Sequence, residues 1–167
     1  MVTKLSEVKD IVAKGIADPS SIFSKIKKMA QSDDWKLREV VSTILVEVSK
    51  KKPDEVVQEM KKWTTSRDPN VRRTASEGLR DIARKSPEKA ISVVDKLKKD
   101  SNLYVKKSVA NILRNAGRYK PEFVLNLCKK WACLKDSNTN WIINDGLRKL
   151  KISHPKETKR ILDLIGK

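Results

Sequence analysis

Four pairs of polar residues could do chemistry, because their types change from pair to pair while their spacing stays fixed. The two members of each pair are four residues apart, which places both on one face of a helix. The pairs are Glu39 and Thr43, Arg73 and Glu77, Lys107 and Asn111, and Trp141 and Asp145, with Trp35 one turn before Glu39. Variation at a fixed offset is typical of a specific site on a repeated scaffold, and its carboxylates are the groups best suited to catalysis.

These residues also admit a plainer interpretation without chemistry. Glu39, Glu77 and Asp145 could be surface acids that pair with nearby cations, and Trp35 could be a half-buried cap over the core. The rest of the chain does not favour another kind of catalysis, because it has no His/Cys/Asp nucleophile set and no Gly-rich phosphate loop. Its one histidine, His154, has no partner in the sequence pattern.

The sequence predicts neither a metal site nor a cofactor. Cys128 and Cys133 lie five residues apart in a helical segment, and no further Cys or His is spaced to complete a set of ligands. We therefore expect both to be reduced thiols that pack in the protein.

Charge indicates the class of partner. The 167 residues include 38 Lys and Arg against 21 Asp and Glu, which gives a net charge of +17. Such a surplus favours a polyanion or an acidic membrane surface, although a lysine-rich proteome can produce it without a specific partner. No apolar run approaches the roughly 18 residues of a membrane span, so we expect a soluble, intracellular, cytoplasmic protein with no membrane partner.

Prolines and helix caps recur every 34 residues. The prolines are Pro19, Pro53, Pro87, Pro121 and Pro155. The same step joins four residues of N-cap type, Asp34, Asp68, Asn102 and Asp136. An N-cap accepts hydrogen bonds from the first turn of a helix, and a proline at the first helical position loses no hydrogen bond. Each unit is therefore predicted to hold one helix after the cap and a second helix after the proline.

Apolar residues recur with the same period and predict the core. In the first helices they are Leu37, Val71 and Val105, then Val41, Ala75, Val109 and Ile143, then Leu45, Leu79, Leu113 and Leu147. In the second helices they are Met29, Trp63, Leu97, Trp131 and Ile165. Offsets of four and eight residues form one stripe along a helix, and stacked units bury such stripes against one another.

The predicted fold class is all-α, a solenoid of about five HEAT-like helix pairs in a single domain over residues 1–167. The expected units are a capping repeat at about 2–32 and repeats at about 33–66, 67–100, 101–134 and 135–167. Tetratricopeptide repeats share the period, but their small-residue pattern is absent here and proline begins the second helix. A stacked solenoid leaves an extended concave surface on which a ligand can bind.

Three rows of cations repeat with the units. They are Lys28, Lys62, Lys96 and Lys130; Arg38, Arg72 and Lys106, followed by the neutral Asn140; and Arg80, Arg114 and Arg148. Helices packed about 8–10 Å apart would set these cations at intervals suited to a phosphate backbone, which favours DNA or RNA. The lysine row could equally be a solvated face, whereas the guanidinium of arginine matches phosphate geometry.

The chain resembles the DNA alkylation repair family of HEAT-like glycosylases, the AlkC/AlkD type, and more closely its AlkC-like branch. The resemblance spans about residues 33–152 and rests on DDWKLREVV, DPNVRRTASEGLR, YVKKSVANILRN and NWIINDGLRKL. It implies removal of N3- or N7-alkylated purines from duplex DNA as a step of base excision repair, without a metal. In the AlkD-like branch the base is not flipped into a pocket.

The resemblance also implies site residues. The family's Trp-x-x-x-acid motif falls on Trp35 and Glu39, its basic pair on Arg72 and Arg73, and the second acid of the AlkC-like pattern on Glu77. Glu39, Trp35 and Glu77 are the expected catalytic residues. The expected DNA-binding residues are Arg38, Arg72, Arg73, Arg80, Lys106, Lys107, Asn111, Arg114, Trp141 and Arg148.

Two departures from the family pattern leave the function open. Asn111 stands where the AlkD-like branch has a second aromatic residue, and Glu39 replaces the Asp of that branch. The chain is also short before the Trp-acid motif. We therefore keep three hypotheses: a monomeric glycosylase that uses Glu39, a non-catalytic scaffold that binds unusual or branched DNA, and a solenoid that binds an acidic protein.

Overall fold

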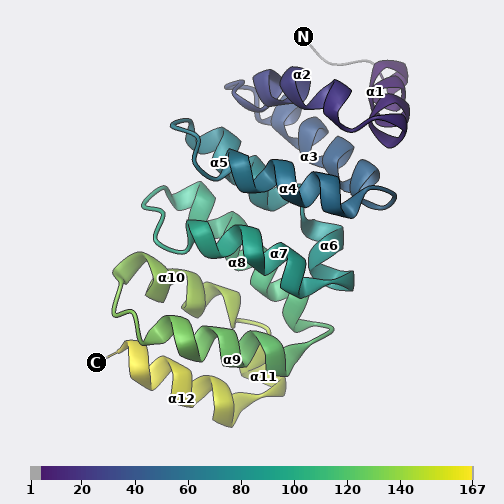
Figure 1. Cartoon of the computed structure of the whole chain (residues 1–167). Helices are drawn as coiled ribbons and strands as arrows, with labels where there is room; N and C mark the ends of the chain where they lie inside the picture. The colour runs from purple at the N-terminus through teal and green to yellow at the C-terminus, as the bar shows by residue number, and fades with distance from the viewer. Residues whose placement is uncertain (1–4, 167) are drawn as a thin grey trace.

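The computed structural model describes residues 5–166, which form two layers of stacked helices (Figure 1). The layer of first helices holds α1 (Leu5–Ala17), α3 (Trp35–Ser49), α5 (Pro69–Glu77) followed by α6 (Arg80–Lys85), α8 (Leu103–Gly117), and α10 (Ser137–Gly146) followed by α11 (Leu150–Ser153). The layer of second helices holds α2 (Ser20–Ala30), α4 (Pro53–Trp63), α7 (Pro87–Val94) with the 3-10 turn η1 (Asp95–Leu97), α9 (Pro121–Ala132) and α12 (Pro155–Ile165). Within the described residues there is no strand, and the predicted all-α solenoid of five helix pairs is confirmed. None of the helices over 5–166 combines the length and the apolar character needed to cross a membrane.

The predicted caps begin the first helices. The side chains of Asp34 and Asp68 accept hydrogen bonds from backbone N–H groups two residues later, at 2.9 and 2.8 Å. Asn102 accepts two such bonds and Asp136 accepts one. Proline is the first residue of α4, α7, α9 and α12, whereas Pro19 lies directly before α2. Local chemistry thus sets where most of the helices begin.

The repeated apolar positions form one core between the layers. Most of the predicted positions are buried, including the large side chains Trp63 and Leu113, while Met29, Leu37 and Ile165 are only partly buried. Cys128 is also buried, and burial raises the pKa of its thiol to about 12. The prediction of a packing thiol was wrong for Cys133, which caps the end of α9 and is exposed.

Two first helices are interrupted just after a glycine that lies against the preceding repeat. A Cβ atom on Gly78 would lie 2.7 Å from Cδ1 and 2.9 Å from Cβ of Leu45. A Cβ on Gly146 would lie 2.7 Å from Cδ1 of Leu113. The equivalent positions in the other two repeats are the buried Ile44 and Ile112, so the residue type at this position alternates between isoleucine and glycine along the stack.

Substitution of Gly78 tests this contact. We expect Gly78→Ala to lower the free energy of unfolding by about 1–3 kcal/mol, because the methyl group meets the Cβ of Leu45 and the backbone must shift. Gly166→Ala is the control, since its Cβ would meet a carbonyl at an ordinary 3.5 Å. That variant should stay within about 0.5 kcal/mol of the parent in urea unfolding. Equal stability of the two variants would contradict a tight contact at Gly78.

Candidate nucleic-acid interface

The four pairs of polar residues lie on consecutive helices of one layer. Their helices α3, α5, α8 and α10 are neighbours in the stack, so equivalent residues form rows across the repeats (Figure 1). We call this surface the first-helix face and define it by the pairs Glu39 and Thr43, Arg73 and Glu77, Lys107 and Asn111, and Trp141 and Asp145. The solenoid therefore brings together residues that are up to about a hundred positions apart in the chain.

Two acids of the first-helix face pair with arginines of a neighbouring repeat. Both terminal nitrogens of Arg80 donate to Oε1 of Glu39 at 3.0 Å. Arg114 donates to Oδ2 of Asp145 at 2.7 Å and to its carbonyl oxygen at 3.2 Å. Arg148 lies 3.8 Å from the same carboxylate, but its side chain is 64% exposed. Arg80 and Arg114 are thus neutralised within the face, as the plainer interpretation of these acids expects.

Glu77 lies among these charges and is largely buried. Burial raises the pKa of its carboxyl above the ordinary value of 4.5, and the charge of Glu39 adds to that rise. The guanidinium groups of Arg80, Arg73 and Arg114 act in the opposite direction without cancelling it. The nearest of them, Nε of Arg80, lies 3.8 Å from Glu77 Oε2. Glu77 therefore holds a proton more readily than an exposed glutamate does.

Trp35 and Glu39 line one groove. Trp35 is the first residue of α3 and is 63% exposed, so it does not act as a half-buried cap. The groove has a volume of about 380 Å³, and Leu5 and Val8 of α1 form its other side. An exposed aromatic face and a carboxylate therefore border the same open space.

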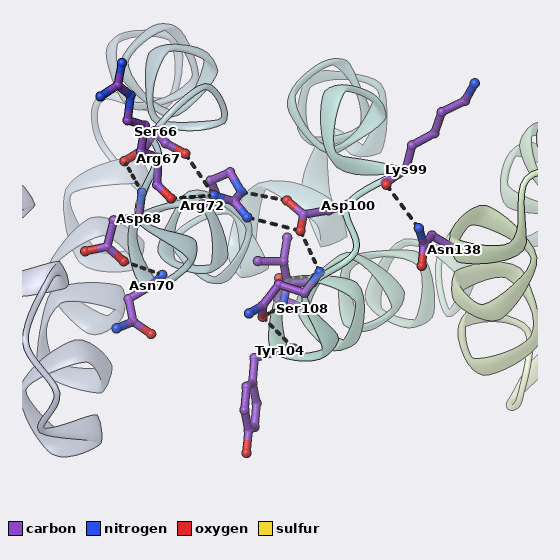
Figure 2. Close-up of polar contacts among 12 residues, drawn as sticks. Ser66, Arg67, Asp68, Asn70, Arg72, Lys99, Asp100, Tyr104, Ser108 and Asn138 are labelled. Carbon is purple, nitrogen blue, oxygen red and sulfur yellow. Dashed lines mark hydrogen bonds and ion pairs between the residues drawn. The ribbon is translucent and has the colours of Figure 1, made fainter.

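The row of Arg38, Arg72 and Lys106 is engaged inside the protein. Arg38 donates to the carbonyl of Ser32 at 2.6 Å. Arg72 donates to the carbonyl of Ser66 at 2.9 Å and, through Nε and Nη2, to Asp100 at 2.6 and 3.2 Å (Figure 2). Lys106 donates to the side chain of Asn138 at 3.1 Å. Arg38 and Arg72 thus turn toward loops between repeats, whereas Lys106 contacts α10 of the next repeat, and the sequence did not predict these roles.

Tyr104 is a candidate site residue that the sequence analysis missed. Its ring is 60% exposed and extends away from the Arg72–Asp100 pair (Figure 2). Arg73 and Lys107 lie 5.9 and 5.6 Å from the ring centroid, so both cations approach one aromatic side chain. Lys106 makes a similar contact with Trp141 at 5.4 Å. The equivalent positions in the other repeats are the polar residues Lys36, Asn70 and Asn138. This change of residue type at a fixed offset is the sequence feature that could have identified Tyr104 as a site residue.

The lysine row lies on the other layer. Lys28, Lys62, Lys96 and Lys130 belong to α2, α4, η1 and α9. Lys62 pairs with Glu59 at 2.8 Å.

In the part of the chain that the structure describes, no group of three or more His, Cys, Asp or Glu residues could hold a metal ion.

Comparisons with known proteins agree with the helical stack. No curated protein matches the chain in sequence. The structure is similar to the Pseudomonas fluorescens alkylpurine DNA glycosylase AlkC bound to DNA containing an abasic site analogue, with a TM-score of 0.77 and 26% identity over 93% of this chain and 44% of that protein. It is also similar to AlkD2 from Streptococcus mutans, with a TM-score of 0.71 and 25% identity over 85% of this chain and 70% of that one. The similarity to smu.31 from Streptococcus mutans UA159, at 23% identity and a TM-score of 0.56 over 90% of this chain and 69% of that one, concerns the fold alone.

The chain spans less than half the length of AlkC. The sequence pattern of HEAT repeats matches residues 23–114, which is more than half of the 167 residues. Because this match, the helix pairs and the similar structures agree, the chain belongs to the HEAT-repeat family and has an AlkC/AlkD-type fold.

Proposed function

We propose that this protein binds duplex DNA along the first-helix face and hydrolyses the N-glycosidic bond of N3- or N7-alkylated purines. The shared groove of Trp35 and Glu39 carries this proposal. Its general part, DNA binding by a repair protein, is supported by the similarity to AlkC and AlkD2 and by the net charge of +17. Its specific part, base excision, depends on what the carboxylate of Glu39 can do.

Only one of the two carboxylate oxygens of Glu39 accepts hydrogen bonds within the part of the protein that the structure describes. Arg80 donates twice to Oε1, and among residues 5–166 Oε2 has no hydrogen-bond partner. An alkylated purine carries a positive charge and leaves readily, so the enzyme must mainly stabilise the oxocarbenium-like sugar and place a water molecule. Oε2 of Glu39 can do both, and the exposed face of Trp35 can attract the cationic base.

Cations on the later helices of the same layer would hold phosphates along the duplex. Arg73 and Lys107 are partly or fully exposed beside Tyr104, and Arg148 is exposed on the same layer. Phosphate contacts of this kind set the register of a protein on DNA without reading its sequence. Glu77 would assist as a second carboxyl group near Glu39, and burial raises its pKa above 4.5.

A non-catalytic DNA-binding scaffold is the second candidate. One observation favours it: Glu39 and Asp145 are both paired with arginines across repeats, and such pairs would also occur on a face that only binds DNA. The chain also matches only 44% of AlkC. The two candidates differ in base release and not in DNA affinity.

Glu39→Gln separates the two candidates. We expect the parent protein to release 3-methyladenine or 7-methylguanine from methylated duplex DNA in single-turnover assays. The variant should be at least about a hundredfold slower with unchanged duplex affinity, because the amide cannot stabilise positive charge as the carboxylate does. Glu55→Gln on α4 is the control, since Glu55 is also exposed and lies near a lysine. Tight duplex binding without release by the parent would favour the scaffold.

DNA binding itself should depend steeply on salt. We expect Arg73→Gln with Lys107→Gln to reduce the slope of log affinity against log salt by about two, one for each lost phosphate contact. Fluorescence anisotropy with a labelled duplex measures this slope. Affinity that does not depend on salt would contradict both DNA-binding candidates, and equal competition by a short acidic peptide would point to an acidic protein partner.

The pKa of Glu77 predicts a pH dependence of stability. Because that pKa is raised above 4.5 in the folded protein, the folded state binds more protons than the unfolded state between 4.5 and the raised value. The Glu77 contribution to stability is therefore present at low pH and lost as pH rises through this window. We expect Glu77→Gln to gain stability relative to the parent as pH rises, measured by urea unfolding at a series of pH values. A difference that does not change with pH would rule out this titration.

A further inference from the structure

A fourth row of cations lies at the far end of the first helices. It consists of Lys50, Arg84 and Arg118, which are 34 residues apart and are all exposed. Lys50 caps the end of α3, Arg84 lies in the last turn of α6, and Arg118 caps the end of α8. We call these three residues the end row. It does not coincide with any of the rows that contain Arg38, Arg80 or Lys28.

The end row is less neutralised than the arginines in the middle of the face. Lys50 pairs with Glu47 at 2.5 Å. Arg84 donates instead to the hydroxyl of Tyr119 at 3.0 Å, and its guanidinium lies 5.5 Å from the centroid of that ring. Within residues 5–166, no carboxylate lies within salt-bridge distance of Arg84 or Arg118. This differs from Arg80 and Arg114, each of which has a carboxylate within 3.0 Å.

Cations at helix C-termini also offset the helix dipole, and that effect alone accounts for some positive charge here. The helix dipole does not explain why the exposed ring of Tyr119 lies beside the end row. Tyr119 is 53% exposed, and it holds the guanidinium of Arg84 by both a hydrogen bond and its π face. A hollow of about 410 Å³ next to the row is lined by Lys50, Arg84 and Asn115, among others. Arg80 and Asp81 also line this hollow, and the carboxylate of Asp81 pairs with Lys85 at 2.9 Å. The end row therefore borders a recess in which cations outnumber acids.

The spacing of the two exposed sets of cations fits the two sides of a DNA groove. Lys107 and Arg118 are eleven residues apart on α8 and its C-cap, which corresponds to about 16 Å along a helix axis. The minor and major grooves of B-DNA are about 6 and 12 Å wide between the surfaces of the phosphate groups. The centres of phosphates on opposite sides of a groove therefore lie a few ångströms further apart than these widths. Between the two sets lie the acid–arginine pairs, which carry little net charge.

We propose that the end row binds the backbone of the second strand, so that the protein holds one groove of duplex DNA by both of its edges. Arg73 and Lys107 hold one strand, and Arg84 with Arg118 and Lys50 holds the other. This inference rests on the proposed DNA binding but not on base excision. It predicts a preference for duplex over single-stranded DNA, because a single strand reaches only one set of cations at a time.

The test compares two triple variants with equal changes of charge. The first is Lys50→Gln, Arg84→Gln and Arg118→Gln. The control is Lys62→Gln, Lys96→Gln and Lys130→Gln on the layer of second helices. The sets are matched, because each contains one lysine that pairs with a glutamate three residues earlier. Anisotropy with a short undamaged duplex and with its single strand, between about 50 and 200 mM salt, gives affinity and salt slope for each.

We expect the end-row variant to bind duplex at least about tenfold more weakly and to reduce the duplex salt slope by about three. Its single-strand slope should not change, so the preference for duplex is lost. The control should keep the parent's values for both. Should the end-row variant be too unstable to assay, Arg118→Gln alone should reduce the duplex slope by about one.

Other outcomes overturn the inference. An unchanged duplex slope in the end-row variant, or equal weakening of duplex and single-strand binding, would contradict a contact to the second strand. Loss of duplex binding in the control would place the DNA on the other layer. If the parent and the end-row variant bind duplex identically, this inference alone is contradicted. If the parent binds no DNA, the proposed function is contradicted as well.

Discussion

The close approach of neighbouring first helices at Gly78 and Gly146 is the constraint on which the charged face of the structure depends. Leu45 fills the space left by Gly78, and Leu113 fills the space left by Gly146. The two acid–arginine pairs of the first-helix face lie at these two contacts between repeats. The bonds from Arg80 to Glu39 span such an interval. A wider spacing would keep the helices but separate the charged groups of the first-helix face.

The cations of the first helices are of two kinds, those held by acids or carbonyls of the protein and those that are not. Arg80 and Arg114 are neutralised by carboxylates, and Arg72 is bound to Asp100 and to loop carbonyls. These contacts connect neighbouring repeats, and removal of one partner would leave an unpaired charge where solvent is partly excluded. Other cations of this layer lie toward the two ends of the first helices, where Arg73 and Lys107 approach Tyr104 and Arg84 approaches Tyr119. Surplus charge alone would not reveal this division.

Sequence patterns predicted the fold better than the site because the fold is encoded by local rules. The caps at Asp34 and Asp68 and the buried Trp63 follow from type and period, and all are confirmed. The ion pair of Arg72 with Asp100 was not predictable. The 34-residue period places Arg72 in a row of cations, but it does not determine whether the side chain reaches Asp100 or solvent. Tyr104 was missed because it lies outside the two offsets that defined the polar pairs. The helix breaks after Gly78 and Gly146 were not predicted, because a single glycine within a helical pattern is ordinarily tolerated.

The alternation of Ile44, Gly78, Ile112 and Gly146 gives the stack a building block of two repeats. Copying or deleting a block of two leaves every glycine beside an isoleucine-bearing neighbour, as it is now. Copying a single repeat instead places two isoleucines or two glycines in succession at this position. A change of length by two helix pairs therefore preserves this order, and it lengthens or shortens the first-helix face by two rows at once.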